Sequence, residues 1–325
     1  MSPIVSILIF VEKVRKKLPI EEEFGLIVFL MNLTVNALAL RLIFSGLAMS
    51  HQNFIMTNSR LSHSFNHFIY GNNLHHFKTF HSTFSHFLST PIIIRHSHTF
   101  SFQYFTETQS LNTNSDYEFI SNIFYKCNSD SKGGGIYIYC DPAPEQLTSS
   151  ITLKSNCFTE CQSSQGGAFY IVCSESFCQE NTFRNCQGGY FSIFNLDTQS
   201  QVAFEQNHII NTKNTDKARQ HSAAISSQKL AIAKNLNVSS NSLDLAHDVF
   251  FISIPSTGLR TEIQYINFLN CISNSIFYVK SLSSSTVERT NFIRNTGLKY
   301  LLDIGSFQLK LIDCSFIEDQ SPVLS

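Results

Sequence analysis

The chain has 325 residues, of which 43% are hydrophobic and only 14% are charged. It carries 23 Lys and Arg against 24 Asp and Glu, and this balance argues against a nucleic-acid partner, which would need a basic surface. With 13 Gly and 7 Pro, the chain is neither collagen-like nor a Pro/Gly-rich disordered segment. Its 30 Phe residues, set among clusters of Asn and Ser, indicate many short strands joined by polar turns.

The first 50 residues contain a long apolar stretch, which we predict to be a helix that serves as a signal peptide or a membrane anchor. Residues 24–40 carry no charge, and they follow a basic cluster made of Lys13, Arg15, Lys16 and Lys17. A spanning helix needs about 20 mostly apolar residues, and positive residues tend to stay on the cytoplasmic side. Either device would place the rest of the chain outside the cytoplasm. A buried hairpin or helix of a soluble fold is the alternative.

Residues 51–115 are rich in His and Phe, and we interpret them as early coils of a repeat or as a cap over its open end. Four phenylalanines have the helical spacing of such a cap, namely Phe77, Phe80, Phe84 and Phe87. His63 and His67 have the i, i+4 spacing of a helical metal pair. No Glu or Cys stands near them to complete a site, so we predict solvent-facing histidines and no metal site.

Residues 116–325 contain a short unit that recurs along the chain: an aromatic or apolar anchor, two variable residues, and then Cys, Asn or Asp. The copies occupy residues 124–127, 158–161, 183–186, 204–207, 238–241, 268–271, 292–295 and 316–319. Successive anchors are 34, 25, 21, 34, 30, 24 and 24 residues apart, so the short spacings match one coil of a parallel β-helix and the long ones a coil with an inserted loop. One coil cannot bury its own apolar face, so stacking of Phe on Phe would create the core.

The residue three positions after each anchor is expected to form a ladder along the axis, reading Cys, Cys, Cys, Asn, Asn, Cys, Asn and Asp. Stacked Asn side chains can hydrogen-bond along the axis, and thiols fill the same small space. Seven of the nine cysteines lie between Cys127 and Cys186, which indicates either an oxidising compartment or a stack of buried, reduced thiols. Asn also stands just before several anchors, as Asn122, Asn156, Asn181, Asn267 and Asn291.

Three early copies are followed by a glycine pair and then by an apolar strand. The pairs are Gly134 with Gly135, Gly166 with Gly167, and Gly188 with Gly189. Paired glycines supply the positive φ or the close backbone approach that a sharp coil corner needs. We therefore predict a corner at each pair and a buried strand after it.

The combination of Gly-Gly-apolar-apolar with Phe-x-x-Asn resembles the repeat of the polymorphic outer-membrane protein family, and similar repeats occur in surface proteins of protozoan parasites such as trichomonads. Two copies match Phe-x-x-Asn in full, at residues 204–207 and 292–295, while four carry Cys at the Asn position. The resemblance covers residues 116–325. It implies an all-β, right-handed parallel β-helix that is displayed at the cell surface and is often linked to adhesion.

An enzyme is the main alternative, because many β-helix proteins are polysaccharide lyases or hydrolases. Glycoside hydrolysis needs two carboxylates about 5–9.5 Å apart, and the nearest candidates are Asp244 and Asp248 beside His247. The chain lacks the adjacent Asp pair, Gly-His-Gly and Arg-Ile-Lys motifs of pectin-degrading β-helix enzymes. We therefore predict no catalytic, cofactor-binding or metal-binding residue.

The expected function is a non-enzymatic β-helix scaffold that is secreted or held at the cell surface and contributes to adhesion or to a surface coat. Its partners would be a host or cell-surface protein or glycan, together with a membrane bound through the N-terminal segment. A β-helix carbohydrate-active enzyme and a truncated family copy without function are the alternatives. Residues 237–239 form a glycosylation sequon, which fits a secreted chain.

Overall fold

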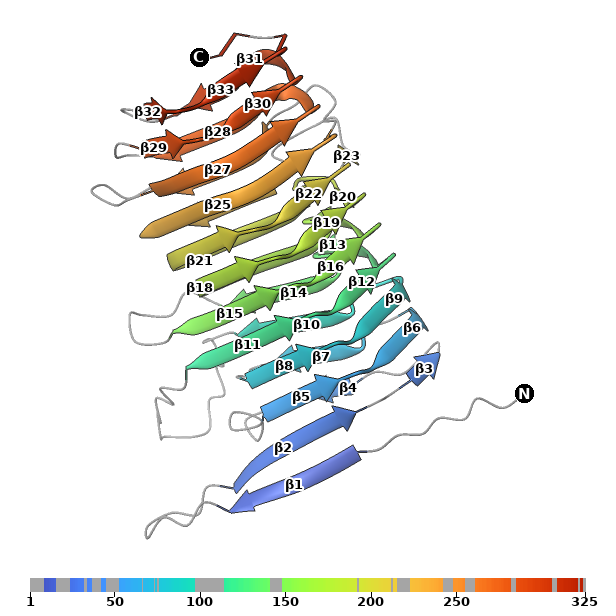
Figure 1. The fold of residues 1–325 in the computed structure, drawn as a ribbon. Coiled ribbons are helices and arrows are strands. Elements are labelled where there is room, and N and C mark those ends of the chain that lie inside the picture. The colour runs from blue at the N-terminus through green and yellow to red at the C-terminus, as the bar shows by residue number, and fades with distance from the viewer. Residues whose placement is uncertain are drawn as a thin grey trace, which may run out of the picture.

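The computed structural model describes residues 9–15, 24–31, 34–36, 42–44, 53–96 without 66, 73 and 75, 114–140, 148–214 without 192 and 212, 223–241, 248–254, 261–281, 285–305, 309–320 and 322–323. These residues form 33 strands and the turns between them, with no α-helix (Figure 1). Strand β1 (Ile9–Arg15) pairs antiparallel with β2 (Phe24–Met31), and every other pairing among the described strands is parallel. The parallel strands stack coil on coil into a β-solenoid, so the predicted all-β parallel repeat is confirmed.

The strands fall into four rows that run along the solenoid axis. The first row contains β2, β5 (Asn53–Thr57), β8 (His76–Phe80), β11 (Ser115–Ile120), β15 (Ser149–Lys154), the second halves of β18 (Phe169–Gln179) and β21 (Phe194–Glu205), the first halves of β25 (Leu230–Ser239) and β27 (Thr261–Leu269), β29 (Ser285–Glu288) and β32 (Leu309–Ile312). The second row contains β3 (Thr34–Asn36), β6 (Arg60–Ser64), β9 (Thr83–Phe87), β12 (Ile123–Tyr125), β16 (Cys157–Thr159), β19 (Thr182–Arg184), β22 (His208–Ile210), the second halves of β25 and β27, β30 (Asn291–Ile293) and β33 (Ser315–Ile317).

The other two rows close each coil. The short third row contains β13 (Asn128–Lys132), β17 (Gln162–Gln165), β20 (Gln187–Gly188) and β23 (Lys213–Asn214). The fourth row contains β4 (Leu42–Phe44), β7 (Ile69–Asn72), β10 (Ile92–His96), β14 (Ile136–Cys140), the first halves of β18 and β21, β24 (Ala223–Ser227), β26 (Asp248–Ile254), β28 (Ile272–Ser281) and β31 (Thr296–Ile304).

Two corners flank the second row, and both are made by residues other than glycine that have positive φ. Twenty such residues have φ between 48° and 58° and form ten pairs spaced five residues apart. The first-corner residues are Asn58, His81, Ser121, Ser155, Glu180, Gln206, Asn235, Tyr265, Arg289 and Asp313, and the second-corner residues are His63, His86, Lys126, Glu160, Asn185, Asn211, Ser240, Asn270, Arg294 and Glu318. Left-handed backbone is unfavourable for most L-residues, so hydrogen bonds between neighbouring coils must hold it in place.

The aromatic anchors stack in the second row, as the repeat predicts. Adjacent ring centroids in the series Phe84, Phe124, Phe158 and Phe183 lie 4.7–5.4 Å apart and nearly parallel. A second series, Phe268, Phe292 and Phe316, has centroids 5.0–5.1 Å apart. Except for Phe316, which is only partly buried, these rings are fully buried, and they form the centre of a continuous core.

The predicted copy at residues 204–207 is wrong in its register. Phe204 pairs with Cys178 in the first row, and Ile209 takes the anchor position beside Phe183 and Val238. The two corner residues are five positions apart, and in every coil but the last each of them follows a buried residue by two positions. A Phe-x-x-Asn match can therefore lie at either corner. The stacking of neighbouring coils selects between them.

The longest asparagine ladder therefore lies at the first corner, two positions before the anchors. Asn122, Asn156, Asn181 and Asn207 are buried on successive coils. The Nδ2 of each of the first three asparagines donates to the Oδ1 of the asparagine in the next coil at 3.0–3.1 Å. The backbone N–H of the same residue donates to that oxygen at 2.8–3.0 Å. Each Nδ2 also donates to a backbone carbonyl of the preceding coil at 2.7–2.9 Å. The ladder thus satisfies the polar groups that this inward turn buries.

The predicted cysteine ladder lies at the second corner. Cys127, Cys161, Cys186 and Cys271 are fully buried, and each thiol lies 3.4–3.6 Å from the carbonyl oxygen of the anchor residue one coil earlier. All nine cysteines are free thiols. Burial raises the pKa of Cys271 to about 11, which keeps this thiol protonated so that it can donate to the Val238 carbonyl.

The third glycine pair does not occupy the corner that the sequence predicted. Gly133 and Gly166 turn the chain with φ of 64° and 69° and lead into strands β14 and β18. Gly188 pairs instead with Ser163 inside the third row, and the following buried strand begins at Phe194. Phe194 is 11 residues after its anchor, the same distance as Phe169 in the preceding coil, so distance from the anchor locates this strand better than the glycines do.

The predicted helices are not found. Residues 24–31, within the proposed N-terminal apolar helix, form strand β2, which pairs with β1 and β5. Phe77 and Phe84 lie in strands β8 and β9, separated by the corner residue His81, so the capping helix is also wrong. Strands β5–β10 pair in parallel with β11, β12 and β14 and belong to the same solenoid. In the described part of the chain, no helix is long and apolar enough to cross a membrane.

Candidate ligand-binding groove

The residues weighed from the sequence as metal ligands or acids do not come together. His63 stacks on His86 with ring centroids 4.7 Å apart, whereas His67 Nδ1 lies 2.7 Å from the hydroxyl of Ser89. Asp248 is buried at the start of β26, and Asp244 and His247 lie outside the described residues. The groups of three or more His, Cys, Asp or Glu that a metal ion needs are not found among the described residues.

A groove of about 520 Å³ follows the second corner over several successive coils. Its lining includes five second-corner residues, the first residues of three third-row strands, and two neighbours. These are His86, Lys126, Glu160, Asn185 and Asn211, then Asn128, Gln162 and Gln187, and finally Leu88 and Cys161. Five of the ten carry side-chain amides, so the groove is dominated by groups that both donate and accept hydrogen bonds.

The solenoid places these amides in two lines parallel to its axis. Lys126, Glu160 and Asn185 are each followed by a buried ladder cysteine, so Glu160 faces out where Cys161 faces in. One position further, Asn128, Gln162 and Gln187 are in register in the third row. Neighbouring strands are about 4.8 Å apart, so equivalent groups repeat along the groove at that interval.

The charges in the groove largely cancel. Lys126 Nζ lies 3.6 Å from Glu160 Oε2. The pKa of Lys126 is raised by its contacts with Tyr125 and Glu160. The pKa of His86 is lowered from 6.5 by burial and then by the charges of His63 and Lys126, so this imidazole is neutral at pH 7. The groove therefore has one ion pair and no unpaired charge among the described residues that line it.

At one end of the groove, two amide side chains form a hydrogen bond with each other. Asn211 Nδ2 donates to Asn185 Oδ1 at 2.6 Å. This contact uses one donor of Asn211 and one lone pair of Asn185, so both amides keep donors and acceptors for a ligand. At the other end, Leu88 exposes 55% of its surface and adds an apolar contact.

A second hollow of about 640 Å³ continues from the groove onto the third row. It shares Asn128 and Gln162 with the groove, and its other lining residues are Ser129, Asp130, Ser163, Ser164 and Gly189. Hydroxyl and amide groups again predominate. The two hollows together make one polar surface across strands β13, β17 and β20.

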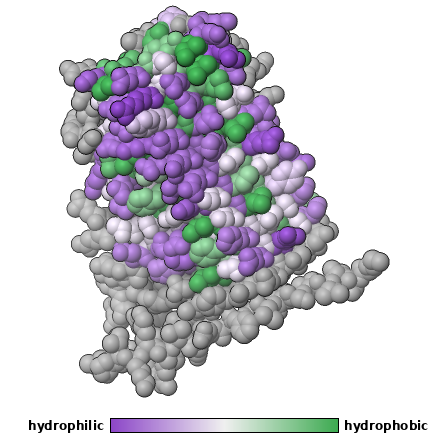
Figure 2. Space-filling view, viewed as in Figure 1, coloured by the Kyte–Doolittle hydropathy of each residue, from purple (hydrophilic) through white to green (hydrophobic). Residues whose placement is uncertain are grey.

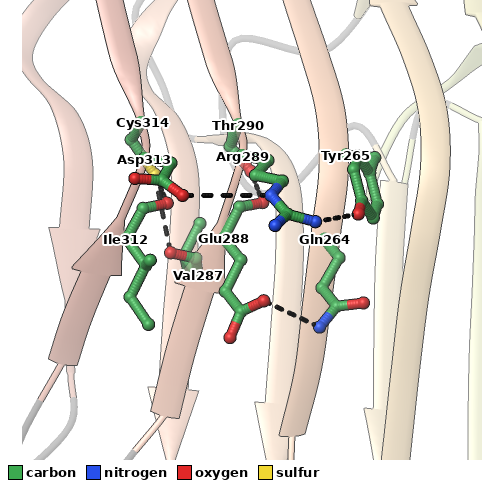
Figure 3. Close-up of polar contacts among 9 residues, drawn as sticks. All are labelled: Gln264, Tyr265, Val287, Glu288, Arg289, Thr290, Ile312, Asp313 and Cys314. Atoms are coloured by element: carbon green, nitrogen blue, oxygen red, sulfur yellow. Dashed lines mark hydrogen bonds and ion pairs between the residues drawn. The ribbon is translucent and has the colours of Figure 1, made fainter.

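At the first corner, in contrast to the groove, side chains of the C-terminal coils contact one another (Figure 3). Arg289 donates to the hydroxyl of Tyr265 with its guanidinium 5.3 Å from the ring centroid, and its Nε lies 3.9 Å from Asp313 Oδ2. Below them, Gln264 donates to Glu288 at 3.0 Å (Figure 3). These side chains bind one another across coils. The face that carries the first and second rows is mainly hydrophilic with separate hydrophobic patches (Figure 2).

The environment of His86 is expected to make stability depend on pH. The folded pKa of His86 is lowered, so the unfolded chain takes up a proton first as the pH falls below about 6.5. We expect the midpoint of urea unfolding to decrease between pH 7 and pH 5. His86→Asn should reduce this pH dependence because it removes the imidazole that titrates, and Asn suits the position because it also tolerates positive φ. The matched control is His81→Asn, an exposed first-corner residue with φ of 49°. Equal pH dependence in wild type and His86→Asn would contradict the prediction.

Sequence reasoning missed the groove residues and singled out histidines and acids instead. A usable signal exists, because four of the five second-corner lining residues come directly before a buried residue that follows an anchor by three positions. Lys126, Glu160 and Asn185 precede the ladder cysteines Cys127, Cys161 and Cys186 in this way. Comparisons of the chain with protein-family profiles, with curated proteins and with solved structures found no match.

Proposed function

We propose that this protein is a non-enzymatic scaffold, secreted or held at the cell surface, that binds a partner through the second-corner groove and so contributes to adhesion or to a surface coat. The observation that carries the proposal is the groove itself, which is built from equivalent positions of successive coils and lined by amides. Repetition of one position along a solenoid creates the extended surfaces that repeat proteins use for binding.

The chemistry of the lining supports a binding role over a hydrolytic one. Glu160 is the only carboxylate among the described residues that line the groove, and Lys126 lies beside it. Glycoside hydrolysis uses two carboxylates in different protonation states. A lone, ion-paired carboxylate is suited to holding an adjacent side chain or a ligand.

Surface location is supported by features of the sequence. The repeat resembles that of polymorphic outer-membrane proteins, which are displayed at the cell surface. We infer that the coil is right-handed, because crossovers between parallel strands almost always are. The free thiols are compatible with this location because the ladder cysteines are fully buried.

Location is tested by adding protease to intact cells that carry the chain with a C-terminal tag. We expect the tag to be lost while a cytoplasmic marker stays intact. A tag that survives until the cells are permeabilised would contradict the surface location.

Binding is tested with beads that carry the purified full chain. Gln187→Trp, on a half-buried third-row position, fills the groove, and we expect adhesion of the beads to cells to fall at least fivefold. Gln201→Trp, on β21 in the first row, is the matched control and should adhere like wild type. Wild-type beads that do not adhere above bare beads would contradict the proposed function.

A further inference from the structure

We infer that the occupant of the groove is an uncharged, extended glycan that lies parallel to the solenoid axis. This inference rests on the proposed function, because it names the partner of the same groove. It follows from three properties of the lining: the kind of polar group, the balance of charge, and the repeat along the axis.

The polar groups suit sugar hydroxyls. A hydroxyl donates one hydrogen bond and accepts others, and a side-chain amide offers both functions within one planar group. Asn185 and Asn211 form one line of amides, and Asn128, Gln162 and Gln187 form the other. A glycan between the two lines would meet donors and acceptors on both sides. The exposed Leu88 offers an apolar contact for the face of a sugar ring.

The charge balance favours a neutral ligand over an acidic one. Lys126 is the only Lys or Arg among the described residues that line the groove, and its ammonium group lies 3.6 Å from Glu160 Oε2. An anionic polymer would have to displace Glu160 from Lys126 and then lie beside the freed carboxylate. A neutral chain can leave this ion pair intact and accept a hydrogen bond from it.

The repeat favours a polymer over a small molecule. Asn128, Gln162 and Gln187 occupy equivalent positions on three successive coils, about one strand spacing apart. A polymer with hydroxyls at regular intervals can make a similar contact at each coil, so contacts that are individually weak add up along its length. Affinity should therefore rise with the number of sugar units.

The experiment uses the purified full chain and a panel of soluble oligosaccharides, namely neutral oligomers of glucose, mannose, galactose and N-acetylglucosamine of two to six units. Heparin and oligogalacturonate serve as acidic probes. We expect at least one neutral series to bind, with affinity rising at least tenfold from the disaccharide to the hexasaccharide, and acidic probes to bind more weakly. Tighter binding of an acidic probe, or no binding of any neutral series, would overturn the inference.

Groove variants locate the binding. Gln162→Ala combined with Gln187→Ala removes two amides of the third-row line and should weaken the hexasaccharide at least tenfold. Gln179→Ala combined with Gln201→Ala, on first-row segments of β18 and β21, should leave it unchanged. Circular dichroism spectra and urea midpoints are compared so that misfolding is recognised, and Gln162→Asn with Gln187→Asn, which keeps the amides, should restore part of the affinity. Equal loss in both alanine variants would contradict the groove as the site.

Periodate treatment of the target cells separates failure of this inference from failure of the proposed function. If bead adhesion needs Gln187 but survives oxidation of cell-surface glycans, the scaffold binds a protein, and the glycan inference is wrong while the proposed function stands. If wild-type beads do not adhere to untreated cells, the proposed function itself is wrong. Adhesion that is abolished by periodate and by the groove variant supports both.

Discussion

Replacement of Asn181 by alanine is expected to destabilise the fold by about 3 kcal/mol or more, because it leaves buried backbone groups without partners. The Oδ1 of Asn181 accepts from the backbone N–H of Asn156 at 3.0 Å, and its Nδ2 donates to the Leu153 carbonyl at 2.9 Å. Alanine can supply neither contact. Asn181 is fully buried, so water cannot readily replace the lost partners.

The measurement is urea denaturation followed by circular dichroism, together with amide hydrogen exchange. The exchange readout is specific, because the N–H of Asn156 should lose protection while amides several coils away keep theirs. The matched control is Asn237→Ala, at a half-buried position in β25 whose side chain lies outside the ladder. We expect that control to change stability by less than about 0.5 kcal/mol. Similar losses from both substitutions would show that the ladder does not stabilise the coil stack.

Gly134→Ala is the second substitution with a large expected effect, about 3 kcal/mol or failure to fold. A Cβ at this position would lie 2.1 Å from the Gly167 carbonyl oxygen and 2.9 Å from those of Cys127 and Gln162. All three are backbone atoms fixed by the stacking of coils, so no side-chain movement relieves the clash.

Two other glycines provide graded controls for this substitution. At Gly135 the nearest atoms, the Ala168 oxygen and the Phe158 ring, are 3.0 Å away, so alanine there should cost less. At Gly305 the nearest group is the Tyr278 side chain, which can move, and we expect a change below about 1 kcal/mol. Thermal and urea midpoints of the three variants should follow this order. A Gly134→Ala protein as stable as Gly305→Ala would contradict the close backbone approach.

The repeat was readable from the sequence because its strongest signal is local. A Phe followed three residues later by Cys identifies Phe124, Phe158, Phe183 and Phe268, and all four stack as anchors. Asn is a weaker marker, since it occurs at both corners. The copy at Phe204 was misplaced for this reason, and Ile209, which has no aromatic ring, was passed over as the true anchor.

The N-terminal error has a similar cause. An uncharged apolar run does not distinguish a helix from a buried strand, because both bury every residue. Residues 24–31 form β2 because β1 and β5 pair with its two edges, and those partners are distant in sequence. The helical spacing of Phe77 and Phe84 led to the wrong prediction of a capping helix. The two residues lie in different strands, with a corner between them.

The sequence by itself determined the class of fold, the Phe-x-x-Cys anchors and the cysteine ladder, because each depends on the identity of a residue and its spacing within one coil. The tertiary structure decided the register of the irregular coils and the composition of the groove. Lys126, Glu160 and Asn185 each precede a ladder cysteine, but they differ in charge and lie in coils of different length, so their chemistry does not mark them as parts of one site. They form one line only because the buried ladder beneath them fixes the turn at which each side chain leaves the solenoid.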